Sequence, residues 1–234
     1  MRITILVDNK TTLNGTIPAW GFSAYVESKR TRILVDTGPN FRTLENNAKI
    51  TGVNLSDVSA IFISHLHGDH YGALEALLSK YKLEIPVFIP SKKFWTKKFR
   101  FGRLIIVDKF MRIIDDMYST GPLGSWLIEH SLIVKIDNNF SVLVTGCAHP
   151  GIVKILEFTT KILGFNVISV IGGMHLLGKS YFELERIVEK ISSFGVKIIC
   201  PCHCSGDDFL KVLLEKFSGK VYPCGCGVII DLDV

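Results

Sequence analysis

The sequence predicts an α/β fold, and three observations support this prediction. Apolar runs typical of strands alternate with amphipathic stretches typical of helices along the chain. Several of the predicted strands end in loops that carry a histidine, and layered folds collect their chemistry in loops at strand ends. The 234 residues are 47% hydrophobic and 21% charged, which is typical of a globular protein with a substantial core.

The first half of the chain begins with strands and then alternates between strands and helices. Bounded by turn residues, the predicted strands are Arg2–Val7, Phe22–Val26, Arg32–Asp36 and Ala60–Ser64. The predicted helices are Phe41–Lys49 and Gly72–Tyr81, the second with three leucines on one face. Residues 85–128 are irregular, with short strand candidates at Val87–Ile89 and Leu104–Val107. We interpret this stretch, which contains a basic and aromatic segment, as a cap.

The second half repeats a unit of strand, loop and helix. Its best-defined helix follows Ser180, which forms a capping box with Glu183 and precedes an apolar stripe that ends before Gly195. The other predicted elements are strands Ser141–Thr145, Val167–Ile171, Val196–Cys200 and Val228–Leu232 and helices Ile152–Leu163 and Asp208–Phe217. Because no low-complexity segment or linker interrupts the chain, we expect one domain over residues 1–234.

Hydropathy argues against a membrane partner, but charge does not distinguish a small anionic substrate from nucleic acid. No apolar run approaches the length of a membrane span, and Met1–Thr4 does not resemble a signal peptide. We therefore expect a cytosolic protein without a membrane partner. The net charge of +5 suits a small anionic substrate about as well as nucleic acid. The oligomeric state is left open.

The most informative segment is His65-Leu66-His67-Gly68-Asp69-His70, which follows a predicted strand. Histidines at i and i+2 can turn to the same side where a strand ends in a loop, and Asp69 with His70 offers further ligands close by. Imidazole and carboxylate together suit zinc, iron or manganese, and an incomplete protein shell leaves room for water. The segment therefore predicts a metal site.

The cysteines form a second pattern. Five of the six lie in the last 35 residues, namely Cys200, Cys202, Cys204, Cys224 and Cys226. Clusters of this kind in a reducing cytosol favour metal binding over disulfides. The Cys-x-Cys spacing differs from the Cys-x-x-Cys of common zinc knuckles, and alternation places such residues on one face of a strand. Core packing, a second metal site and a disulfide all remain open.

Several motifs together resemble those of the metallo-β-lactamase superfamily of binuclear metallohydrolases. The histidine segment 65–70 follows Leu34-Val35-Asp36-Thr37-Gly38, and the landmarks recur in the family's order over nearly the whole chain. Four further segments resemble a branch often labelled 7,8-dihydropterin-6-methyl-4-(β-D-ribofuranosyl)-aminobenzene-5′-phosphate synthase. They are Tyr118–Leu123, Thr145–Ile152, Ile171–Leu176 and Pro201–Gly206.

The resemblance implies a four-layer αββα sandwich with two divalent metal ions at one edge, zinc being expected ahead of iron or manganese. It implies one metal held by His65, His67 and His149 and the other by Asp69, His70 and His203. Asp36 is expected to brace the ligands from behind.

One departure from the family concerns the aspartate that links the two metals in most hydrolytic members. Cys147 stands where that aspartate is expected, and the other candidate position ends in His175. Either residue changes how the metals are linked and how acidic their water is. We place Cys147 behind the ligands, with Asp36.

The mechanism that the resemblance implies is hydrolysis by a metal-bound hydroxide. We expect Asp69 to orient the water and His175 to protonate the leaving group. The leading hypothesis is a metal-dependent hydrolase of a small, phosphorylated or pterin-like metabolite. The alternatives are the synthase of the branch label, which joins a pterin to a ribofuranosyl-aminobenzene phosphate, a nuclease, and a non-catalytic or redox metal-binding protein.

Two further features receive functional and structural interpretations. Residues 92–103 interleave six positive charges with four aromatic residues, as expected of a cap over an anionic ring-containing substrate, of a nucleic-acid contact or of a solvated edge. We favour the cap, with Lys97, Lys98 and Arg100 as substrate-binding residues and nucleic acid as an unlikely partner. For His130 we expect a surface or capping role.

Overall fold

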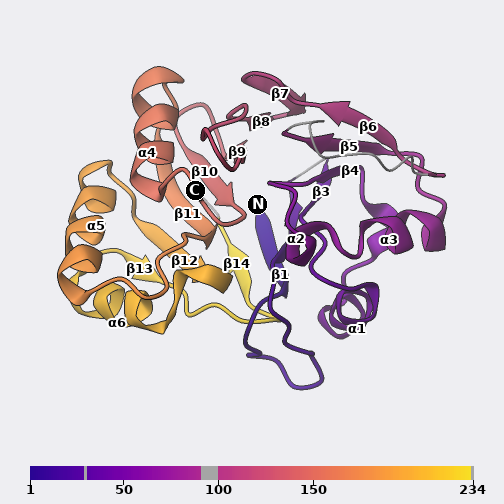
Figure 1. The fold of residues 1–234 in the computed structure, drawn as a ribbon, viewed down its shortest axis with the longest axis horizontal. Helices are drawn as coiled ribbons and strands as arrows, with labels where there is room; N and C mark the ends of the chain where they lie inside the picture. The colour runs from indigo at the N-terminus through magenta and orange to yellow at the C-terminus, as the bar shows by residue number, and fades with distance from the viewer. Residues whose placement is uncertain (29–30, 91–99, 233–234) are drawn as a thin grey trace.

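Two seven-stranded sheets pack face to face and are covered by helices on both outer sides (Figure 1). This arrangement comes from a computed structural model, which describes residues 1–28, 31–90 and 100–232. The four layers confirm the predicted αββα sandwich.

The first sheet is built from the N-terminal half of the chain and closed by the last strand. Its strand order is β14-β1-β2-β3-β4-β5-β6. In that order the bounds are Ile229–Asp231, Arg2–Val7, Ser23–Glu27, Arg32–Val35, Ala60–Phe62, Pro86–Ile89 and Arg103–Ile106. The helices of this half are α1 (Phe41–Thr51), α2 (Gly68–Tyr71) and α3 (Leu74–Tyr81). From β3 to β6 the strands run parallel, so their carboxyl ends meet at one edge.

The second sheet comes from the C-terminal half. Its strand order is β13-β12-β11-β10-β9-β8-β7. In that order the bounds are Lys220–Val221, Ile198–Cys202, Val167–Gly173, Ser141–Thr145, Leu132–Lys135, Met117–Ser119 and Met111–Ile114. Helices α4 (Ile152–Glu157), α5 (Tyr181–Ser193) and α6 (Asp207–Lys216) cover its outer face (Figure 1). Strands β10 to β13 are parallel, so a second set of carboxyl ends is available.

Alternation along the strands divides the apolar residues between the inner and outer layers. In β10, Val142 and Val144 belong to the core between the sheets, whereas Leu143 packs under the outer helices. In β3, Ile33 and Val35 face the inner core and Leu34 faces the outer one. Because both faces of each sheet are covered, the strands are apolar almost throughout, as expected of buried parallel strands.

The differences between predicted and observed elements are largest in the middle of the chain. The interpretation of residues 85–128 as a cap needs correction, because β5 and β6 extend the first sheet and β7 and β8 extend the second. Within this stretch, residues 123–127 line a hollow that His149 and His175 also line. The helix predicted over Ile152–Leu163 is α-helical to Glu157 and continues as a π-helical turn, Phe158–Ile162.

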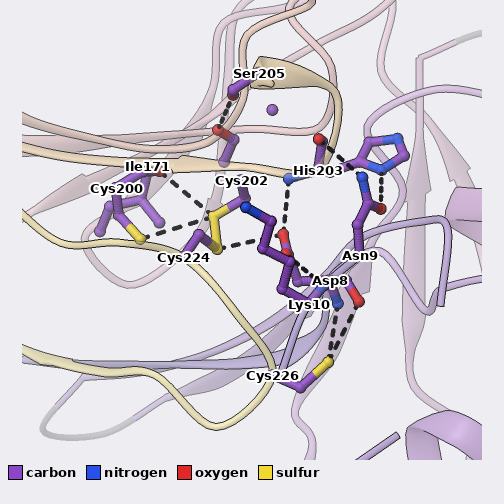
Figure 2. The surroundings of a disulfide bond; sticks show 12 residues. Asp8, Asn9, Lys10, Ile171, Cys200, Cys202, His203, Ser205, Cys224 and Cys226 are labelled. Atoms are coloured by element: carbon purple, nitrogen blue, oxygen red, sulfur yellow. Dashed lines mark hydrogen bonds between the residues drawn. A yellow bond between two sulfur atoms is a disulfide. The ribbon is translucent and has the colours of Figure 1, made fainter. Parts of the chain in front are cut away.

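The cysteines adopt one of the alternatives left open by the sequence. A disulfide joins Cys202 at the end of β12 to Cys224, with 5.2 Å between their Cα atoms (Figure 2). The four other cysteines are free and buried. Cys200 lies beside the disulfide, and these three sulfur atoms lie within 4.8 Å of one another, as a metal site also requires.

In the described part of the chain, no helix has the length and apolar character that a membrane crossing requires.

Candidate metal centre

The predicted site residues meet where the carboxyl ends of strands from both sheets converge. The histidine segment follows β4, His149 follows β10, and His203 begins a 3-10 turn directly after β12. Non-glycine residues with positive φ occur here, with values of 55° at Asp36, 57° at Ala148 and 50° at His203. Such backbone strain persists only where the surrounding structure holds it, and it gathers at functional sites.

The structure brings His65, His67 and His149 together as the resemblance implies. The Nε2 atom of His65 lies 3.1 Å from the Nδ1 atom of His67. The ring of His149 lies 4.7 Å from that of His65 and 5.1 Å from that of His67, measured between centroids. His65 is fully buried, and burial lowers its pKa well below the usual value, so the ring is a neutral nitrogen donor.

The second predicted group lies beside the first. The Oδ2 atom of Asp69 is 3.3 Å from Nε2 of His203 and 3.8 Å from Nε2 of His70. Burial raises the pKa of Asp69, but the hydrogen bond from His203 and the charge of His70 outweigh it and lower the value to about 2. Asp69 is therefore a carboxylate at neutral pH.

Asp36 occupies the bracing position predicted for it. Its carboxylate accepts hydrogen bonds of 2.7 Å from the backbone N–H of Ser64, from the Ser64 hydroxyl and from Nδ1 of His70. The Ser64 oxygen in turn accepts from Nδ1 of His65 at 2.9 Å. The backbone after β10 passes close to Ser64, since a Cβ atom on Gly146 would lie 1.9 Å from the Ser64 hydroxyl. Only glycine allows this approach.

Glu129 is a site residue that the sequence analysis missed. It is 1% exposed, and its two oxygens accept four hydrogen bonds. The backbone N–H groups of Cys147 and Ala148 donate to Oε1, at 2.9 and 2.8 Å. The backbone N–H and Nδ1 of His149 donate to Oε2, also at 2.9 and 2.8 Å. Burial raises the pKa of Glu129, but the hydrogen bonds from His149 and the charge of His65 outweigh it and hold the pKa well below its usual range.

Asp8 and Asn9, which directly follow β1, orient the last ligand and were also missed. The buried Oδ2 of Asp8 accepts a 2.7 Å hydrogen bond from the backbone N–H of His203 (Figure 2). The Asn9 side-chain oxygen accepts from Nδ1 of His203 at 3.0 Å. The signal available in the sequence was the same one that identified the histidines, namely polar residues directly after a strand.

The ligand geometry fits a divalent metal. His65, His70, His149 and His203 each donate Nδ1–H to an oxygen, which belongs to Ser64, Asp36, Glu129 and Asn9 respectively. This pattern leaves Nε2 of each ring directed at the centre, where it can bind a metal ion in place of a proton, which is how metal-binding histidines are oriented. Nitrogen, carboxylate and thiol donors converge here, and zinc and iron accept such mixed sets.

The predicted acid, His175, is exposed at the mouth of the centre. Its ring lies 4.6 Å from the His149 ring, between centroids, and its backbone is in the left-handed region with φ 52°. Burial, together with the charge of His149, lowers its pKa. His175 lines two hollows, of about 760 and 580 Å³, which also share Lys154. Trp126, which is 94% exposed, lines the smaller one.

The remaining site predictions have different outcomes. Lys97 and Lys98 lie outside the described residues, and the exposed Arg100 rests its guanidinium 5.4 Å from the Phe101 ring centroid. The expected surface or capping role of His130 is wrong. This residue is fully buried and stacks on Phe62, with 3.9 Å between the ring centroids. Its apolar neighbours Leu132 to Val134 gave no sign that the ring points inward.

Comparisons with known proteins agree with this geometry. A family model of the metallo-beta-lactamase superfamily matches residues 21–135. The solved structure of a metal-dependent hydrolase of the beta-lactamase superfamily superposes on the whole chain, and over its own whole length, with a TM-score of 0.85 and 26% identity. The chain therefore has the fold of the metallo-β-lactamase superfamily and resembles that superfamily in sequence over residues 21–135.

Two relatives from Methanocaldococcus jannaschii extend the comparison to the branch. The 7,8-dihydropterin-6-methyl-4-(β-D-ribofuranosyl)-aminobenzene-5′-phosphate synthase of this organism is 27% identical, over 89% of this chain and 88% of its own. An uncharacterized protein of the same organism is 29% identical, over 91% of this chain and 94% of its own. The chain is therefore similar to the synthase branch that its motifs indicated.

Proposed function

We propose that the protein is a metal-dependent hydrolase of a small anionic metabolite, with two divalent ions and zinc as the expected metal. The observation that carries the proposal is the paired arrangement of His65, His67 and His149 with Asp69, His70 and His203, beside open hollows. Bound ions would supply a nucleophilic water at neutral pH and polarise a carbonyl or phosphoryl oxygen.

The side chains around the centre provide the remaining parts of a hydrolytic site. Asp69, ionised at neutral pH, can accept a hydrogen bond from the attacking water and so orient it. His175 lies on the solvent side of His149, where a leaving group would depart, and can donate a proton to it.

The substrate class follows from the walls of the smaller hollow. Trp126 offers an exposed aromatic face and Lys154 a positive charge, and both lie next to His149. An aromatic face and an ammonium group together suit a ring-bearing anion such as a phosphorylated or pterin-like metabolite. The volume of about 580 Å³ is in the range of small-molecule sites. We expect such a ligand ahead of nucleic acid, and a cytosolic location remains a prediction.

Replacement of Asp69 by alanine tests the proposal. Zinc-loaded protein should hydrolyse bis(4-nitrophenyl) phosphate or a generic ester, and Asp69→Ala should lower kcat by about 100-fold or more while circular dichroism stays unchanged. Asp208→Ala is the matched control, since that carboxylate is exposed and paired with Lys211 on α6. Equal turnover in Asp69→Ala and wild type contradicts the proposed role.

The similarity to the dihydropterin–ribofuranosylaminobenzene-phosphate synthase supports a second candidate function. In a synthase the same centre would activate a leaving group, and no hydrolytic water is needed. Incubation of a dihydropterin and a ribofuranosyl-aminobenzene phosphate, separately and together, distinguishes the two. Product that forms only with both substrates favours the synthase, whereas release of an acid from a single ester favours the hydrolase.

A further inference from the structure

We propose that the thiolate of Cys147 links the two metal ions, in the place where most hydrolytic members of the superfamily use an aspartate. The inference rests on the metal centre of the proposed function and adds a ligand to it. It also changes the expectation that Cys147 lies behind the ligands.

The first observation is the position of the sulfur atom between the two ligand groups. Cys147 Sγ lies 3.2 Å from Nε2 of His70. Together with His65 and His149 it forms one set of ligand atoms that all lie within 4.8 Å of one another. With His70 and His203 it forms a second such set. Of the described residues in these two sets, Cys147 is the shared member.

The distance between Cys147 and His70 suits two ligands of one metal ion. Zinc binds sulfur at about 2.3 Å and nitrogen at about 2.0–2.1 Å, so two ligands on one ion lie about 3.1–3.6 Å apart. The separation of 3.2 Å between Cys147 Sγ and the His70 nitrogen falls in this range. A thiolate also carries the same charge as the carboxylate that it replaces, so the charge balance of the centre is kept.

The second observation concerns the end of the strand that leads to the other candidate position, His175. Strand β11 ends in Gly172 and Gly173. A Cβ atom would lie 2.0 Å from the carbonyl oxygen of Thr145 at the first position and 2.2 Å from that of Gly146 at the second. Neither glycine position can therefore carry an aspartate, so the end of β11 itself supplies no linking carboxylate.

The third observation is that the backbone of Cys147 is fixed before any metal binds. Its N–H donates to the buried Glu129, as does the N–H of Ala148, whose φ is 57°. The side chain is only 3% exposed, so the thiol is directed inward and not toward solvent. A fixed thiol between two ligand sets favours softer ions such as zinc and iron over magnesium or manganese. Metal binding then displaces the thiol proton to solvent.

X-ray absorption of the zinc-loaded wild-type protein tests the inference without any substitution. A linking thiolate gives an average of about one sulfur neighbour per zinc at about 2.3 Å, because both ions share it. A thiolate on one ion alone gives about half a sulfur per zinc, and a packed thiol gives none. Either of the last two results overturns the inference. Failure to retain about two zinc ions per chain overturns the proposed metal centre as well.

Cobalt substitution identifies the cysteine. Wild-type protein with two Co(II) ions should show a sulfur-to-cobalt charge-transfer band in the near ultraviolet. Cys147→Asp should keep about two ions and lose the band, because a carboxylate restores the link without sulfur. The matched control is Cys204→Ser, a buried thiol next to Cys147 that is in neither ligand set, and it should keep both the ions and the band.

The outcomes separate the inference from the alternatives. A band that persists in Cys147→Asp assigns the sulfur to other cysteines, such as the group around Cys200, and overturns the inference. If Cys147→Asp does not fold, Cys147→Ser serves in its place and should lose the band together with part of the metal. Phosphodiester hydrolysis with two ions but without a sulfur signal rejects the Cys147 link and leaves the proposed function intact.

Discussion

The floor of the metal centre and its rim are built in opposite ways. The floor consists of Asp8, Asp36, Ser64 and Glu129, which are all buried and hydrogen-bonded to ligands or to the segments that carry them. The rim consists of Trp126, Lys154, His175 and Leu177, and all four side chains are exposed, the Trp126 indole at 94%. Buried hydrogen bonds thus fix the positions of the metal ligands. The side chains that would contact the substrate are exposed and are held by few contacts.

The floor also shows how buried charge is tolerated here. Each of its carboxylates accepts several hydrogen bonds, and a buried charge without such partners would cost several kcal/mol. The rim carries no comparable constraint, so its residues can vary with the ligand. The comparison predicts that floor substitutions change metal binding and stability, whereas rim substitutions change KM.

The largest effect is expected for Glu129→Gln in the floor. The amide keeps one acceptor oxygen but turns the other into an NH₂ donor, which then faces N–H groups of the loop 147–149. Loss of such an orienting partner typically weakens metal binding by about 10- to 100-fold. Competition with a chromophoric chelator measures this affinity.

Glu157→Gln is the control for this substitution, because Glu157 is an exposed helix residue paired with Lys161. It should bind metal like the wild type. If Glu129→Gln binds zinc as tightly as Glu157→Gln does, the floor does not orient the ligands, and the contrast between floor and rim fails.

Much of the metal centre could be predicted from the sequence because its ligands follow a local rule. The segment 65–70 has metal-ligand spacing in six consecutive residues, and His149 and His203 each lie in the segment that follows a strand. The four-layer fold follows from the alternation of strands and helices. Each of these signals is contained in a short stretch of sequence, so the pattern of residue types is enough to detect it.

The orienting residues could not be predicted because their partners are distant in the sequence. Glu129 bonds to residues 18 to 20 positions away, and Asp8 to a residue 195 positions away. Nothing near Glu129 in the sequence distinguishes it from a surface carboxylate, and the place of Asp8 directly after a strand does not reveal its distant partner. The strands β7 and β8 were missed for a related reason, since such short strands have little periodicity and depend on the sheet that they join.

A second, smaller effect is expected from His130, which supports the floor from behind. Its Nε2 donates to the carbonyl oxygen of Ile63 and its backbone N–H to that of Ser64, where the histidine segment begins. Burial lowers the pKa of His130 from 6.5 to about 3. The unfolded chain therefore binds a proton below pH 6.5 that the folded chain refuses until about pH 3, so stability falls as the pH falls through this window.

The size of this effect is about 2 kcal/mol of unfolding free energy between pH 7 and pH 5. His130→Gln is expected to be less stable at pH 7 but to lose about 2 kcal/mol less over this interval, as urea denaturation at the two pH values measures. Ser119→Ala removes the hydroxyl that contacts Nδ1 and keeps the imidazole, so its pH dependence should match the wild type. Identical pH dependence in His130→Gln and wild type would show that His130 is not held neutral.

The smallest of these effects belongs to the rim. Trp126→Ala removes an exposed face from the hollow beside His149 but none of the hydrogen bonds of the floor, so kcat, zinc content and stability should stay near the wild-type values. Loss of one stacking contact is worth about 1 kcal/mol, so KM for a ring-bearing phosphoester should rise about fivefold. Trp126→Phe should recover most of this loss, and Phe182→Ala, an exposed aromatic on α5, should leave KM unchanged. A fall in kcat with KM constant would mean that Trp126 acts on the reacting atoms, and that rim and floor are not separate parts of the site.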